Sequence, residues 1–232
     1  IVHAEGGLFK TQDWVESGRD YEQSALVGLV EVENATPHQA WERFTSEGPL
    51  AVLPSHYGPN ILNLVWCGSP ESSQERLQLS DADFLKSLQA KFGTRIGQFL
   101  KVQDRRLYAL GLNYRKEIAL KNEVWIGNAA QTMHPVAGQG FNVGLRDAYE
   151  LAQQIAQTSP EAWGQDAMMR VYQQGRKTDT KRGLLFTDFL VNLFSNDIVG
   201  VSGLRGMSLG ILDLLKPVKS RLVRKMSFGS RG

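Results

Sequence analysis

Residues 123–147 read EVWIGNAAQTMHPVAGQGFNVGLRD, and this stretch decides the fold that the sequence predicts. Val124 to Ile126 are β-branched or aromatic, so they predict a short buried strand that ends at Gly127. Gly127, Ala129 and Ala130 carry almost no side chain. A bulky ligand could therefore lie directly against the backbone after this strand.

The second half of the stretch predicts a turn that opens into a helix. Pro135 disfavours helical backbone at the residue before it, so the chain stays extended there. Gly138 and Gly140 then permit a tight turn. The free N–H groups at the start of the following helix would carry a partial positive charge and suit an anionic or polar ligand. The apolar face expected for this helix consists of Leu145, Ala148, Leu151, Ala152 and Ile155. The glycine spacing alone is equally compatible with an ordinary strand-to-helix connection.

The whole string resembles the second flavin-binding motif of the FAD-dependent aromatic monooxygenases, the p-hydroxybenzoate hydroxylase-like family. The matching residues are Gly127, Ala129, Ala130, Pro135, Gly138, Gln139, Gly140, Asn142, Gly144 and Asp147. Asn128 stands where the family usually has Asp, and this variant is similar to the ubiquinone-biosynthesis branch. The similarity continues through residues 41–45, 48–51 and 64–67.

This resemblance implies FAD as cofactor and NAD(P)H as reductant. The cofactor-binding residues that it implies are Gly127, Asn128, Ala129, Pro135, Gly138, Gln139, Gly140 and Asn142. The turn from Gly138 to Gly140 would bind the pyrimidine edge of the flavin, and Pro135 would line the face of the ring. Asn128 would bind the ribityl or phosphate region. No catalytic acid or base is identified, and no His or carboxylate cluster has metal-ligand spacing.

The composition is that of a globular chain. Its 232 residues are 42% hydrophobic and 22% charged, which suffices for one or two domains. Cys67 is the single cysteine, so an internal disulfide is excluded, and its apolar neighbours predict a buried, inert thiol. His38 and His56 are expected in solvated loops.

The expected fold class is α+β or α/β: an antiparallel-sheet substrate domain, the C-terminal part of an FAD-binding Rossmann-like domain, and terminal helices. Residues 1–20 would be a remnant of the FAD-binding domain, 21–113 the substrate domain, 114–158 the returning FAD-binding segment, and 159–232 a helical region. In the family, the sheet of the substrate domain covers the reactive face of the flavin. The strands expected in it are Ser24–Val32, Leu50–Leu53, Ile61–Cys67 and Arg105–Leu112, with a helix between Ser80 and Gly93.

Glu5 and Gly6 fall on the Asp-Gly motif that in the family contacts the flavin and the nicotinamide cofactor. No residue before Glu5 can supply the Gly-x-Gly-x-x-Gly that holds the ADP half of FAD. Together with Ile1 in place of an initiator Met, this indicates the C-terminal portion of a longer enzyme.

The C-terminal region combines apolar helices with positive charge. Residues 184–194 and 209–215 predict apolar helices, which either pack on the cofactor unit or contact lipid. The six basic residues that follow have no acidic neighbour: Lys216, Lys219, Arg221, Arg224, Lys225 and Arg231. The expected location is cytoplasmic, with peripheral contact to the inner face of the cell membrane.

The function that the resemblance implies is hydroxylation of a polyprenylated phenol in ubiquinone biosynthesis. The expected partners are this substrate and other ubiquinone-biosynthesis proteins, without nucleic acid. Two alternatives remain open: a flavin-dependent reductase of prenyl lipids, and a non-catalytic membrane-docking or assembly subunit.

Overall fold

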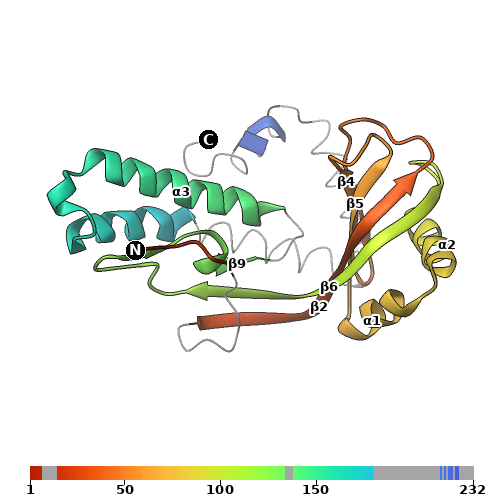
Figure 1. The fold of residues 1–232 in the computed structure, drawn as a ribbon, viewed down its shortest axis with the longest axis horizontal. Coiled ribbons are helices and arrows are strands. Elements are labelled where there is room, and N and C mark those ends of the chain that lie inside the picture. The colour runs from red at the N-terminus through yellow and green to blue at the C-terminus, as the bar shows by residue number, and fades with distance from the viewer. Residues whose placement is uncertain are drawn as a thin grey trace. The chain divides into compact units, whose positions relative to one another are not determined.

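The computed structural model describes residues 1–6, 15–133, 138–179, 215, 217, 219–221 and 223–224, with backbone only for 15–20. The chain divides into two compact units (Figure 1). Unit 1 contains Ile1–Asp20, Gly111–Val191 and Ile198–Gly232, and unit 2 contains Tyr21–Leu110 and Asn192–Asp197.

Unit 2 is built on an antiparallel sheet, as the apolar runs predict. The strands of this sheet are β2 (Val15–Val32), β3 (Trp41–Thr45), β4 (Gly48–Pro54), β5 (Ile61–Gly68) and β6 (Phe99–Arg115). Residues 15–20 of β2 and 111–115 of β6 belong to unit 1. The order in the sheet is β3-β4-β5-β2-β6, followed by β9 (Gln131–Thr132) from unit 1. All four expected strands are confirmed, and β2 and β6 are longer than expected. The strand β3 had not been predicted.

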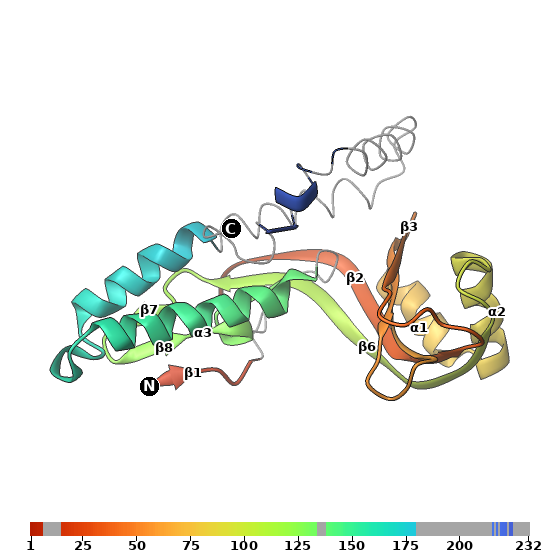
Figure 2. The same ribbon diagram turned by 90° about the horizontal axis from the view of Figure 1, so that it is seen from above.

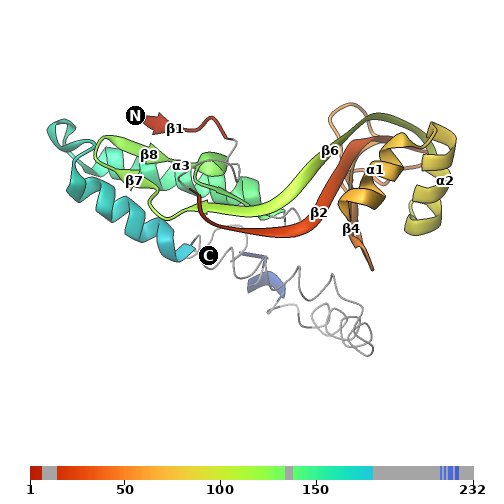
Figure 3. The same cartoon turned by 90° about the horizontal axis from the view of Figure 1, so that it is seen from below.

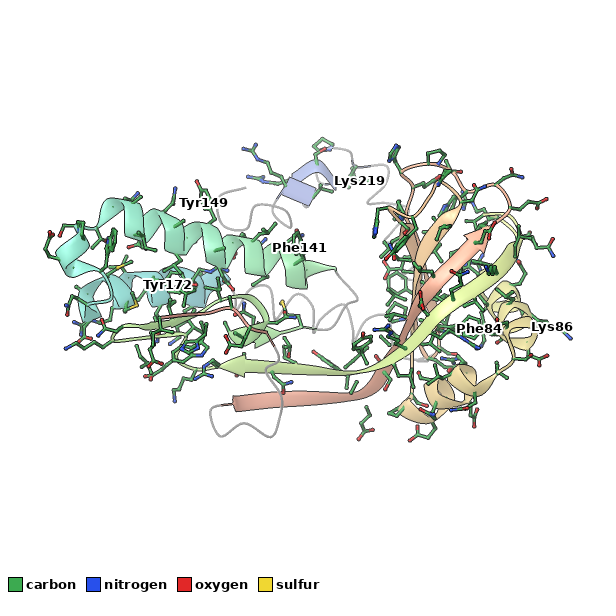
Figure 4. All side chains as sticks on the ribbon, in the orientation of Figure 1. Phe84, Lys86, Phe141, Tyr149, Tyr172 and Lys219 are labelled. Atoms are coloured by element: carbon green, nitrogen blue, oxygen red, sulfur yellow. The ribbon has the colours of Figure 1, made fainter. Side chains whose placement is uncertain are left out.

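Two helices cover one face of this sheet (Figure 3). Helix α2 (Asp81–Phe92) begins at Ser80, whose side chain accepts the Asp83 N–H, and ends at Gly93, as expected. Helix α1 (Pro70–Gln78) was not predicted; Ser69 caps it and Pro70 starts it. Phe84 is buried toward the sheet while Lys86 points away from it (Figure 4). The core between helices and sheet contains Leu26, Val30, Leu50, Val52, Leu62, Leu64, Trp66, Phe84, Leu88 and Phe92.

In its described part before residue 180, unit 1 combines a small sheet with helices (Figure 2). Its sheet has the order β1-β8-β7, from β1 (Val2–His3), β8 (Glu123–Trp125) and β7 (Ala119–Leu120). After β8 come the short 3-10 helix η1 (Gly127–Ala129), strand β9 and helix α3 (Gln139–Gln157), and then the 3-10 turn η3 (Pro160–Ala162). Residues 166–179 form a further helix beside α3. The apolar core of the unit includes Val124, Trp125, Ala129, Ala130, Leu151, Met168, Met169 and Tyr172.

The buried face of α3 differs from the one that the apolar pattern predicts. The buried positions are Gln139, Val143, Asp147 and Leu151, which recur every four residues. Leu145, Ala148 and Ala152 are exposed, and so are Phe141 and Tyr149 (Figure 4). The prediction was wrong at these positions because a small and a charged side chain, Gly144 and Asp147, face the interior. Hydrophobicity alone could not reveal this.

Several expectations fall outside the described residues: Pro135, the apolar helices over 184–194 and 209–214, and most of the basic tail. In the part of the chain that is described, no helix is long and apolar enough to cross a membrane.

Candidate functional site

The carboxyl ends of two parallel strands bring distant segments of unit 1 together. Strand β1 pairs with β8 in parallel, with Val2 opposite Val124 and His3 opposite Trp125. The His3 ring stacks on the Trp125 indole, with centroids 4.6 Å apart and planes 6° apart. The turns after both strands therefore lie at the same edge. A Cβ added to Gly6 would lie 3.8 Å from the Cβ of Asn128. Ligands commonly bind at such an edge in α/β sheets.

The turn after β8 approaches helix α3 closely at two glycines, Gly127 and Gly144. A Cβ on Gly144 would lie 3.3 Å from the Cα of Gly127, which is tighter than ordinary van der Waals contact. Gly127 itself has φ +58°, a left-handed conformation that glycine adopts without strain. Ala129 and Ala130 are buried behind the turn, and the Asn128 side chain is exposed at its tip. The two glycines thus set the distance between turn and helix.

A buried carboxylate on α3 ties down this turn. Asp147 is 0% exposed. Its Oδ2 accepts the backbone N–H of Gly127 at 2.9 Å and the side-chain Nε2 of Gln131 at 2.7 Å. Gly127 and Gln131, the residues on either side of the segment 128–130, are therefore hydrogen-bonded to the same oxygen atom. Sequence reasoning matched Asp147 to the family motif but assigned it no role.

A second helix supplies the counter-charge. Arg176, on the helix over 166–179, donates from Nε to Asp147 Oδ1 at 2.7 Å and from a terminal nitrogen to Asp179 Oδ2 at 2.9 Å. Asp179 also receives Arg146 Nε from α3 at 2.8 Å. Burial raises the pKa of Asp147, and the adjacent Arg176 guanidinium opposes that rise. The pKa of Asp179 is lowered by Arg176 and Arg146, which outweigh its own burial.

The sequence carries one weak signal for Arg176. It follows Tyr172 by four residues and so shares a helical face with Met169 and Tyr172, both buried. A lone charge in register with an apolar helical face indicates a buried ion pair, but its partner is 29 positions away and cannot be read from spacing.

The glycine turn leads directly into the start of α3. Gly138 has φ +58°, and no side chain caps the helix there. A Cβ added to Gly138 or to Gly140 would meet no atom of the described residues within 4 Å. No acidic side chain occupies the first turn, so the positive end of the 19-residue helix is not neutralised locally. An uncapped helix start of this kind suits an anionic group or the electron-rich edge of a ring.

The structure gives a definite place to most of the predicted cofactor residues. Asn128 is exposed beside Gly6 at the strand edge. Gly138 and Gly140 line the open helix start, Gln139 is buried and Asn142 is half-buried. Pro135 lies outside the described residues.

The other histidines and the cysteine considered from the sequence belong to unit 2. His38 and His56 are exposed in loops of unit 2, as expected, and Cys67 is buried with its pKa raised to about 12 by burial. Within the described ranges no cluster of three or more His, Cys, Asp or Glu side chains could hold a metal ion.

A family model described as the FAD binding domain matches residues 18–185. The chain belongs to this FAD binding domain family. Three relatives extend the match. The chain is 32% identical to the uncharacterized protein slr1300 of Synechocystis, over 98% of this chain and 56% of the relative. It is 35% identical to the ubiquinone hydroxylase UbiL of Rhodospirillum rubrum, over 88% and 48% of the two chains. It is 28% identical to 3-demethoxyubiquinol 3-hydroxylase of Escherichia coli, over 82% and 48%.

The fold of this chain is similar to that of solved structures. Klebsiella pneumoniae HpxO, solved with FAD and uric acid, matches with a TM-score of 0.66 at 15% identity, over 97% of this chain and 58% of that one. The chain spans about half the length of the curated relatives it matches. The expected fold class is thereby confirmed.

Proposed function

We propose that the full-length protein containing this chain is an FAD-dependent monooxygenase that hydroxylates a polyprenylated phenol in ubiquinone biosynthesis, with NAD(P)H and O₂ as co-substrates. The main support is the 35% identity to a ubiquinone hydroxylase, combined with the motif from Gly127 to Asp147 held at one strand edge. The string is similar to that of 2-octaprenyl-6-methoxyphenol hydroxylase, which acts on this substrate class.

The residues of unit 1 would hold the flavin half of FAD. Free N–H groups at the start of α3 would bind the pyrimidine edge, where negative charge collects on reduction. Asn128 can both donate and accept hydrogen bonds to the ribityl or phosphate region, and it brings no charge that would repel phosphate. Pro135 would line the flavin face. When bound, FAD supplies the redox chemistry and the transfer of one oxygen atom from O₂.

Unit 2 would provide the surface for the apolar substrate. Its sheet has one face under α1 and α2, and the alternate side chains point to the other face. Val27, Leu29, Ala51 and Val65 lie on this second face and are only partly buried. A face that stays in water is usually polar, so this apolar composition supports an apolar occupant such as a prenylated ring.

The experiment is turnover by the purified full-length protein. With a polyprenylated phenol, NAD(P)H and O₂, it should form one hydroxylated product for each O₂ and each NAD(P)H consumed. Reduction of a prenyl double bond without oxygen uptake would instead indicate the reductase. Absence of flavin and of any turnover would indicate the docking or assembly subunit.

We also propose peripheral contact with an anionic membrane through the basic C-terminal segment, and contact there with other ubiquinone-biosynthesis proteins. Lys219, Arg221 and Arg224 are exposed on helical backbone (Lys219 in Figure 4). Each basic residue near such a surface contributes on the order of 1 kcal/mol. Binding to liposomes should therefore require anionic lipid and weaken with salt; binding that is indifferent to both contradicts this proposal.

A further inference from the structure

One carboxylate holds both ends of the turn that carries Asn128. Gly127 and Gln131 donate to the same Asp147 oxygen at 2.9 and 2.7 Å, and the three residues between them have no other comparable tether to α3 among the described hydrogen bonds. The position of Asn128 relative to the start of α3 thus depends on where the Asp147 carboxylate points.

Asp147 cannot hold that orientation alone. It is fully buried, and a buried carboxylate without a counter-charge is strongly disfavoured. Its other oxygen accepts Arg176 Nε at 2.7 Å, and Arg176 is only 2% exposed. The guanidinium is itself fixed by Asp179, which Arg146 of α3 also holds. The planar, multiply bonded guanidinium therefore sets the direction of the Asp147 side chain.

We propose that Arg176 is a positioning residue for the flavin: acting through Asp147, it places the Gly127–Gln131 turn against the cofactor and so sets the affinity for FAD. This inference rests on the proposed function. Arg176 lies on a different helix from every residue of the flavin motif.

Two double variants of the full-length protein separate positioning from stability. In D147L/R176M both charges are replaced by apolar groups, which typically restores much of the stability lost on breaking a buried pair, but the turn loses its acceptor. In D147N/R176M an amide oxygen remains at position 147 to accept the Gly127 N–H, again without an unpaired charge.

The readouts are the FAD dissociation constant, from quenching of flavin fluorescence, and the melting temperature of the apoprotein. D147L/R176M should bind FAD at least about tenfold more weakly than wild type, the size expected for one lost buried hydrogen bond. D147N/R176M should bind FAD more tightly than D147L/R176M but still more weakly than wild type, because the amide keeps an acceptor for the Gly127 N–H but has lost the guanidinium that orients it. The single variant R176M should be impaired in both affinity and stability.

A matched control uses the ion pair between Arg76 and Glu47 in unit 2, which joins α1 to the β3–β4 hairpin. E47L/R76M should lower the melting temperature without changing the FAD dissociation constant. Wild-type affinity in D147L/R176M overturns the proposal. If that variant does not fold, wild-type affinity in D147N/R176M overturns it. A wild-type protein that binds no FAD refutes the proposed function instead.

Discussion

Glu42 is an ionisable side chain on the face of the unit 2 sheet opposite α1 and α2. It lies on β3 opposite Ala51 of β4, and burial among apolar neighbours raises its pKa to about 7. Within the described residues no hydrogen bond or ion pair stabilises its charged form. The side chain is nevertheless exposed to solvent, so the effect should be much smaller than the shift alone implies.

The raised pKa predicts a pH-dependent penalty on folding. Both states are protonated below the unfolded pKa near 4.5, so no penalty exists there. As the pH rises from 4.5 through about 7, the unfolded state ionises first and the wild type loses stability relative to Glu42→Gln. The melting temperature of Glu42→Gln should therefore match the wild type at pH 4.5 and exceed it at pH 8. A gap of equal size at both pH values would contradict the assignment.

Gly140 and Gly144 should respond differently to a larger side chain, although both belong to the flavin motif. Among the described residues, a Cβ at Gly140 meets no atom within 4 Å, whereas one at Gly144 would lie 3.3 Å from the Gly127 backbone. Gly140→Val in the full-length enzyme should therefore keep the fold but abolish FAD retention and hydroxylation. Gly144→Val should lower the free energy of unfolding by about 1–3 kcal/mol through overpacking. Absorbance at flavin wavelengths and thermal melting test both; a fully active Gly140→Val enzyme would refute the flavin site.

At the scale of elements, local signals succeeded where they concern backbone geometry. Ser80 and Gly93 bound α2 as the sequence indicates, because caps act on groups within the first and last turn. The apolar pattern failed for the inward face of α3, since Gly144 and Asp147 face partners from η1 and the helix over 166–179. Helix α1 was missed because its sequence is mostly polar; only Ser69 and Pro70 mark its start.

The cap of α2 offers a test at this scale. Ser80 Oγ accepts the Asp83 N–H at 3.2 Å and contacts Asp83 Oδ2 at 2.6 Å. Ser80→Ala should lower the free energy of unfolding by about 1 kcal/mol in chemical denaturation. Ser80→Thr keeps the hydroxyl and should lose only a fraction of that amount. Equal losses of unfolding free energy in the two variants would mean that the hydroxyl at position 80 does not stabilise the helix.

At the scale of the whole molecule, we expect the chain to hold one part of a cofactor site. The Gly127–Gly140 segment is suited to the flavin ring, but the sequence contains no Gly-x-Gly-x-x-Gly for the ADP half of FAD. The 232-residue chain purified by itself should consequently be colourless, while the full-length protein is yellow. Stoichiometric FAD bound to the isolated chain would show that the site is complete without the remaining half.

The sequence by itself determined the strand-turn-helix unit around Gly127, the antiparallel sheet of unit 2 and the family, because alternation, glycine placement and motif spacing act over a few residues. Only the tertiary structure decided which face of α3 is buried, that Gly6 meets Asn128, and that Arg176 reaches Asp147 across 29 positions. These contacts join segments that are far apart in the chain. A buried charge is tolerated only where its partner arrives from another element, and no local pattern records that partner.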